Sequence, residues 1–200
     1  MLSFMDTLAI AVKFFFILTP FFIVAVFLAV TENETVEVRH KLAVRVCLGV
    51  IVISLVLLWF GKPLFELLGI TVDAFRIGAG ALLFLSAVSL VNGKITLPDS
   101  KRSIMDLAIV PLAIPMTLGP GSVGALVVMG SETSGLLNLV LTSCAVTVAS
   151  VCVGALLYLS EQVKRLIGRS GISMLSKITG LVLASLSCQM MFTGIASFLK

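Results

Sequence analysis

The sequence predicts an all-α integral membrane protein in which six transmembrane helices form two inverted three-helix repeats. Three observations predict this fold class. The composition is that of a chain embedded in lipid, six long apolar segments follow one another, and the second half repeats features of the first. We further expect helices 1 and 4 to be broken near mid-membrane.

The composition excludes an ordinary soluble domain. Hydrophobic residues make up 59% of the chain and charged residues 12%, whereas soluble domains are roughly 45–50% apolar and about 25% charged. The mean hydropathy is +1.20. The net charge of +4 does not indicate nucleic-acid binding, because the basic residues are scattered over short loops. We therefore expect the lipid bilayer, and no nucleic acid, as a partner.

A helix needs about 20 mostly apolar residues to cross a bilayer. Six segments meet this requirement: 5–31, 42–60, 71–92, 106–130, 136–159 and 173–198. We expect the first to be a permanent helix and not a cleaved signal peptide. No positive charge precedes it, and no small-residue cleavage site ends it.

The basic residues predict the orientation of the helices. With six spans, ten of the 14 lysines and arginines fall on one side of the membrane. These ten are Arg39, Lys41, Arg45, Lys94, Lys101, Arg102, Lys164, Arg165, Arg169 and Lys177. By the positive-inside rule that side is cytoplasmic. We expect a multi-pass protein of the inner (plasma) membrane with both termini outside.

Two halves of the sequence resemble each other. Met5, Asp6, Leu18, Pro20, Ala25 and Glu32 recur 100 residues later as Met105, Asp106, Leu118, Pro120, Ala125 and Glu132. With a shift of 101, Arg76, Ile77, Leu82, Leu85, Ser86 and Gly93 recur as Lys177, Ile178, Leu183, Leu186, Ser187 and Gly194. Each copy holds three spans, an odd number, so the second must enter the membrane from the opposite face. We expect one repeat over 1–95, a short cytoplasmic linker over 96–104 and an inverted repeat over 105–200.

Helix breakers occupy matching places in the two copies. Pro20 lies near the middle of the first span, and Gly119-Pro120-Gly121 lies in the fourth, after Pro111 and Pro115. An interior proline costs roughly 3 kcal/mol, and hydrocarbon cannot satisfy the freed backbone groups. The sequence therefore predicts a cavity at mid-membrane. The alternative is that single prolines merely kink ordinary helices.

Broken helices also predict the ligand. A half-helix that restarts at a proline presents free amides to an anion, and one that ends presents free carbonyls to a cation. A small zwitterion such as an amino acid matches both kinds of terminus. Transport and channel activity are both compatible with such a site, as is a non-transporting structural or regulatory role.

The charged residues near the spans have simpler interpretations. Asp6 and Asp106 are expected to cap their helices, and Glu32 and Glu132 to be solvated helix ends. Lys13, Arg76 and Lys177 lie near span ends, where a long side chain reaches the interface. The broken spans hold no charge between Phe14 and Thr31 or between Leu107 and Ser131. A coupling ion, H⁺ or Na⁺, would then be held by carbonyls and hydroxyls.

Other residues favour packing over chemistry. Glycines and serines of the third and sixth spans are expected to let those helices pack closely, whereas Asn92 and Gln189 line the cavity or cross-link helices. The sole histidine, His40, lies in a loop, and the spans offer no nucleophile with a partner base. We expect no enzymatic activity, no metal and no cofactor.

Four segments carry a resemblance to a known family. Ile109 to Val123, IVPLAIPMTLGPGSV, resembles the signature of the MarC family of bacterial and archaeal membrane proteins. Residues 69–80 resemble its third span, and 171–180 and 189–195 its sixth. The similarity covers the whole chain.

The resemblance implies a six-span inner-membrane protein. The best understood relatives, the SnatA-type proteins, move small neutral amino acids such as glycine and alanine. Carried over to this chain, the resemblance implies a substrate site formed by two short stretches. The site residues are Thr19, Pro20, Phe21, Thr117, Gly119, Pro120, Gly121 and Ser122.

One departure from the family bears on the substrate. The family usually has Asn-Pro in the first span, whereas this chain has Thr19-Pro20, so an amide donor is lost and an oxygen is kept. Phe21 and Phe22 replace the glycine that often follows. A bulkier, more apolar wall changes which substrate fits. The expected function is secondary transport of a small neutral amino acid by alternating access.

Overall fold

The computed structural model describes residues 3–69, 71–93 and 117–199, and the expected linker over 96–104 lies outside these ranges. The described residues confirm an all-helical protein with several apolar helices. Four helices are long and apolar enough to cross a membrane, and a bent helix pair forms a fifth candidate span. The expected span over 106–130 is described only from residue 117 onward.

The bent pair consists of α1 (Phe4–Ile17) and α2 (Pro20–Val30), which meet at an angle of 41°. Ser3 and Asp6 start α1 with a reciprocal capping box. The Ser3 hydroxyl accepts from the Asp6 amide at 3.1 Å, and the Asp6 carboxylate accepts from the Ser3 amide at 2.9 Å. The predicted capping role of Asp6 is confirmed, and so is the predicted break in the first span.

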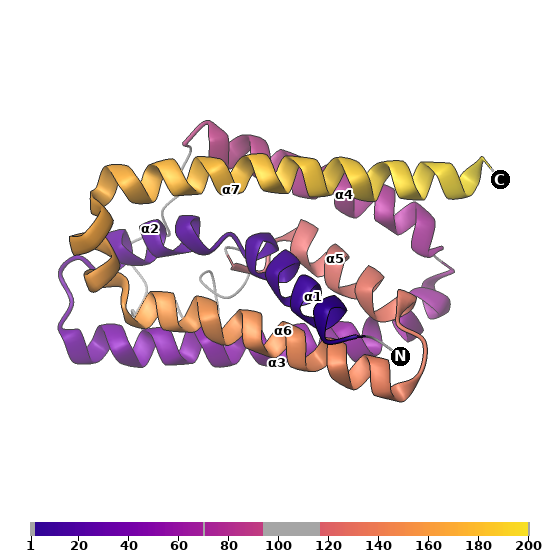
Figure 1. Cartoon of the computed structure of the whole chain (residues 1–200), viewed down its shortest axis with the longest axis horizontal. Coiled ribbons are helices and arrows are strands. Elements are labelled where there is room, and N and C mark those ends of the chain that lie inside the picture. The colour runs from indigo at the N-terminus through magenta and orange to yellow at the C-terminus, as the bar shows by residue number, and fades with distance from the viewer. Residues whose placement is uncertain (1–2, 70, 94–116, 200) are drawn as a thin grey trace.

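Two antiparallel helix pairs form the outer layers of the molecule (Figure 1). One pair is α3 (Val36–Leu68) with α6 (Leu136–Tyr158), where Gly154 lets the helices approach closely at Cys47. The other is α4 (Val72–Val91) with α7 (Ser160–Phe198), the most extensive helix–helix contact. Gly168, with φ of 68°, interrupts α7, and its membrane span begins at Ser170.

Small residues explain how closely α4 and α7 pack. A Cβ on Gly80 would lie 2.6 Å from Cγ of Met191, and one on Gly180 would lie 3.0 Å from the carbonyl oxygen of Ala87. The packing role predicted for the small residues of the third and sixth spans is confirmed at these glycines.

Between the two pairs lie α1, α2 and α5 (Pro120–Glu132). Figure 1 shows that α2 and α5 both begin near the middle of the molecule and run toward opposite ends. The beginning of α1 and the end of α7 lie at the end toward which α5 runs. The core between the layers is apolar, with Phe14, Phe27 and Leu126 fully buried.

Candidate functional site

The first break is a sharp turn at Thr19. Its φ of 51° and ψ of 55° place it in the left-handed region, and among the described non-glycine residues it alone has a positive φ. The Thr19 amide donates to the Phe16 carbonyl, and its carbonyl accepts from the Ile23 amide, the first hydrogen bond of α2. Phe21 and Phe22 lie in the first turn of α2, before that hydrogen bond. The N–H groups of a first helical turn have no acceptor within their own helix.

A second helix, α5, also begins at a proline, although its N-cap is extended and not left-handed. Gly119 is the N-cap of α5 and Pro120 its first residue, as Thr19 and Pro20 are for α2. The Gly119 carbonyl accepts from the Val123 amide at 3.0 Å and from the Ser122 hydroxyl at 3.2 Å. A helix begins at each of the two prolines, and at Pro20 it restarts after α1, as predicted. The part of the fourth span before residue 117 lies outside the described residues, so a restart at Pro120 stays a prediction.

Gly121 has a packing role. A Cβ at this position would lie 2.6 Å from Cα of Leu83, and one on Gly124 would collide with Ala79. Both glycines therefore let α5 lie against α4. The space beside Gly121 is occupied by α4, whereas the sequence led us to expect a ligand beside this glycine.

The predicted site residues are largely buried in the packing between helices. Thr19, Thr117 and Ser122 are each less than a tenth exposed, and Phe21 is half-buried. Ile17, just before the first break, faces a pocket together with Leu83, on which Gly121 packs. The end of α1 and the α4 residue on which α5 packs therefore line one pocket. The predicted residues themselves do not line either of the two pockets that follow.

A first pocket, the α2 pocket, has a volume of about 220 Å³ and lies between α2, α4 and α7. It is lined by Ala25 of α2 and by Glu32 in the turn after α2, and by Ser89 of α4 and Ser173 of α7, among others. It is mainly apolar, with hydroxyl groups on the side of the long helices.

A second pocket, the α5 pocket, has a volume of about 300 Å³ and is bordered by α1, α4, α5 and α7. It is the more polar of the two. Its charged and amide-bearing lining residues are Lys13, Arg76, Glu132 and Gln189. An adjoining cavity of about 350 Å³ shares Lys13 and Glu132 with it and extends to Asn138 of α6.

The two pockets are lined by equivalent residues of the duplicated sequence. Ala25 and Glu32 of the α2 pocket correspond to Ala125 and Glu132 of the α5 pocket at an offset of 100. The recurrence of these residues was visible in the sequence. Because the two glutamates were interpreted as solvated helix ends, they were not predicted to line pockets.

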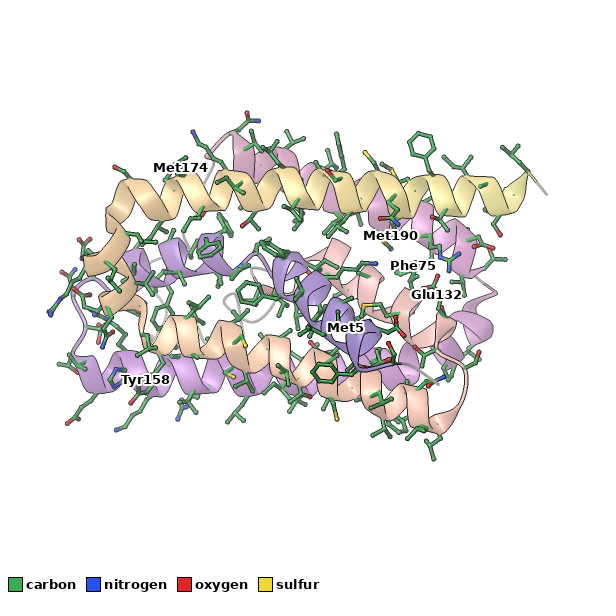
Figure 2. All side chains as sticks on the ribbon, viewed as in Figure 1. Met5, Phe75, Glu132, Tyr158, Met174 and Met190 are labelled. Carbon is green, nitrogen blue, oxygen red and sulfur yellow. The ribbon has the colours of Figure 1, made fainter. Side chains whose placement is uncertain are left out.

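The charges at the α5 pocket are organised around Arg76. Its guanidinium binds Asp73 at 2.9 Å and also Glu132, and its side chain is only 14% exposed. Ser197 donates to Asp73 at 2.7 Å, so these contacts join α4, α5 and α7. The expectation that Arg76 reaches to the interface stays a prediction, and the structure adds that two carboxylates near the ends of α4 and α5 hold its guanidinium. In Figure 2, Glu132, Phe75 and Met190 gather at this end of the molecule.

A separate ion pair closes the opposite end. Arg39 binds Glu161 at 2.9 Å and donates to the Thr31 carbonyl at 3.0 Å, which joins α3 and α7 to the end of α2. Beside it, His40 stacks on Tyr158 with ring centroids 3.8 Å apart. Within the described ranges, no three His, Cys, Asp or Glu side chains are grouped as ligands of a metal ion.

Comparison with known proteins identifies the family. The model of the MarC family of integral membrane proteins matches residues 4–199. A "UPF0056 membrane protein" from Aquifex aeolicus is 31% identical over 92% of this chain and 89% of its own length. A UPF0056 membrane protein from Methanocaldococcus jannaschii is 32% identical over 90% of this chain and 91% of its own.

More distant relatives include YhcE of Escherichia coli, another UPF0056 membrane protein, which is 28% identical over 90% of this chain and 87% of its own length. No solved structure matches the chain. The relatives thus share a membrane location by name and match this chain nearly end to end. The chain belongs to the MarC family of integral membrane proteins.

Proposed function

We propose that the protein is a secondary transporter of the inner membrane that carries small neutral amino acids, such as glycine or alanine, by alternating access. The observation that carries this proposal is the pair of pockets at opposite ends of two half-helices, lined by equivalent residues. A transporter built from duplicated halves needs such a pair, because each half provides the access route on one side.

The arrangement of the helices supports an inverted repeat of three spans and three spans. The equivalent helices α3 and α6 run antiparallel, as do α4 and α7, and α2 and α5 run toward opposite ends (Figure 1). A rotation about an axis in the membrane plane would relate such pairs, whereas a direct repeat would leave them parallel. The described part of the fourth span, α5, fits its place in this arrangement.

The two restarts provide a means of holding a zwitterion. The first-turn amides of α2, and those of Gly121 and Ser122 in α5, precede the first hydrogen bonds of their helices. Because helix dipoles place partial positive charge at such termini, they attract a carboxylate. In the proposed cycle, substrate passes from one pocket to the other along the stretch of α4 near Leu83.

The distribution of charge supports an orientation. Basic residues concentrate at the end of the molecule where α3 begins and α7 begins: Arg39, Lys41, Arg45, Lys164 and Arg165. By the positive-inside rule this end is cytoplasmic. The α2 pocket then serves the cytoplasm and the α5 pocket the outside, with both termini outside.

Uptake by purified protein tests the proposal. The full chain is reconstituted into liposomes and supplied with labelled glycine, alanine, serine or threonine, with empty vesicles as the control. Saturable uptake of at least one of these solutes is expected. Absence of flux above the empty vesicles for all of them would reject transport of small neutral amino acids. Flux that does not saturate would indicate a channel.

A further inference from the structure

Lys13 is a charge placed deep in the membrane-spanning part of the molecule. It lies nine residues after Phe4 in α1, which is about 14 Å along the helix at 1.5 Å per residue. That is close to half of the roughly 30 Å hydrocarbon thickness. A charge within a membrane-spanning segment points to function, and the Lys13 side chain is exposed, so a ligand can reach it.

The face of α1 on which Lys13 lies looks into the α5 pocket. Ile10, Lys13 and Ile17 are spaced three and four residues apart and therefore share one face of the helix. Ile17 lines the α5 pocket, Ile10 lines the adjoining cavity, and Lys13 lines both. The lysine thus borders a polar space and not only lipid.

Lys13 also differs from the other charges of the pocket. Arg76 is held by Asp73 and Glu132. In the part of the chain that the structure describes, no carboxylate forms an ion pair with Lys13. Because Lys13 is exposed beside the pocket, its ammonium group is accessible to an anion that enters there.

We propose that Lys13 binds the α-carboxylate of the transported amino acid in the α5 pocket, an inference that rests on the proposed function. Glu132 lies in the same two cavities and uses Oε1 to bind Arg76. In the proposed complex its other oxygen accepts a hydrogen bond from the substrate ammonium group. The pocket then recognises both charges of a zwitterion, one from α1 and one from α5.

The duplication makes this recognition specific to one pocket. Ala113 stands 100 residues after Lys13, so the second half of the sequence has no lysine at the corresponding position. We therefore expect tighter binding of substrate from the side of the α5 pocket than from the side of the α2 pocket.

Substitution of Lys13 in reconstituted full-length protein tests the inference. Lys13→Met keeps the length of the side chain and removes the charge, and Lys13→Arg keeps the charge. Loss of a charge-assisted hydrogen bond is expected to raise the KM for alanine about tenfold to a hundredfold in Lys13→Met. Lys13→Arg should restore most of the affinity. Lys41→Met, an exposed lysine of α3 that lines neither pocket, is the matched control and should transport as the wild type does.

Alaninamide, which lacks the carboxylate, separates recognition from a structural role. The wild type should be inhibited by alaninamide far more weakly than by unlabelled alanine, and this preference should shrink toward equality in Lys13→Met. An unchanged preference in Lys13→Met would overturn the inference while leaving transport established. A wild type without uptake would instead reject the proposed function. Gel filtration shows whether Lys13→Met folds. If it does not, the preference for alanine over alaninamide is measured in Lys13→Arg instead. Because Lys13→Arg retains the positive charge, loss of that preference in this variant would overturn the inference.

Discussion

Thr19 adopts a conformation that a β-branched residue rarely takes. A left-handed backbone at a non-glycine residue costs about 1–3 kcal/mol, and Asn and Gly tolerate it better. The family's usual Asn at this position therefore has a backbone explanation that does not involve substrate. The strained conformation persists because the helices on either side of Thr19 are held in place, α1 by packing on α6 and α2 by packing on α7.

Replacement of Thr19 should reveal this strain. Thr19→Asn is expected to raise the free energy of unfolding by about 1 kcal/mol, because Asn lowers the cost of the left-handed turn. Thermal unfolding in detergent measures the change. Thr19→Ala is the control, since it removes the hydroxyl but keeps a Cβ at a positive φ. Equal stability of the Asn and Ala variants would show that the turn is not strained.

Gly121 was predicted to bind substrate, but in the structure it allows α5 to pack against α4. Gly121→Ala would bring a methyl group against Leu83 and is expected to destabilise the protein by about 1–3 kcal/mol. Gly78→Ala on α4 is the matched control, because its Cβ meets no described atom within 4 Å and alanine favours a helix. Thermal unfolding of both variants checks this. A Gly121→Ala protein as stable as Gly78→Ala would contradict the packing role, and loss of uptake could then be assigned to the ligand.

Among the elements, α5 is the half-helix that the ion pairs hold most directly. Its amino end rests on α4 through Gly121 and Gly124, and its carboxyl end is tied to α4 by Glu132 and Arg76. By the duplication, the equivalent pair at the end of α2 would be Glu32 with Lys177. In the proposed transport cycle, one such pair holds its half-helix closed while the other opens.

Loosening the outer pair should open the α5 pocket. Glu132→Gln is expected to raise the rate at which a maleimide modifies Ala125→Cys, measured in a background without the native cysteines. Ala125 is only 5% exposed, so its modification requires opening. A partly exposed ion pair contributes up to about 1 kcal/mol, which corresponds to an increase of about two- to fivefold. Arg39→Gln, at the opposite end, is the control; an equal increase there would indicate general loosening.

At the scale of the whole molecule, the proposed inverted arrangement places the two pockets at opposite faces of the membrane. A membrane-impermeant maleimide applied to right-side-out vesicles should modify Ala125→Cys and spare Ala25→Cys. Inside-out vesicles should give the reverse, because the two half-helices run toward opposite ends. Modification of both cysteines from one side would contradict an inverted arrangement of the two halves.

The main features of the fold could be predicted because they depend on local chemistry. Lipid embedding follows from composition, and the ends of the long helices follow from apolar length and capping, as at Ser3 and Asp6. The helix starts at Pro20 and Pro120 follow from the ring, which fixes φ and removes an amide. The site was harder to predict, because the residues that break a helix need not be those that line a pocket.

The sequence by itself determined that this chain is a membrane protein and that helices begin at Pro20 and Pro120. Each of these features depends on the types and the spacing of residues that are close together in the sequence. Only the tertiary structure decided that Gly121 packs on Leu83, that Arg76 is held by two carboxylates, and that Lys13 faces a pocket with Glu132. Those contacts depend on which face of each helix packs against its neighbours. That face is determined by packing between helices that are far apart in the sequence.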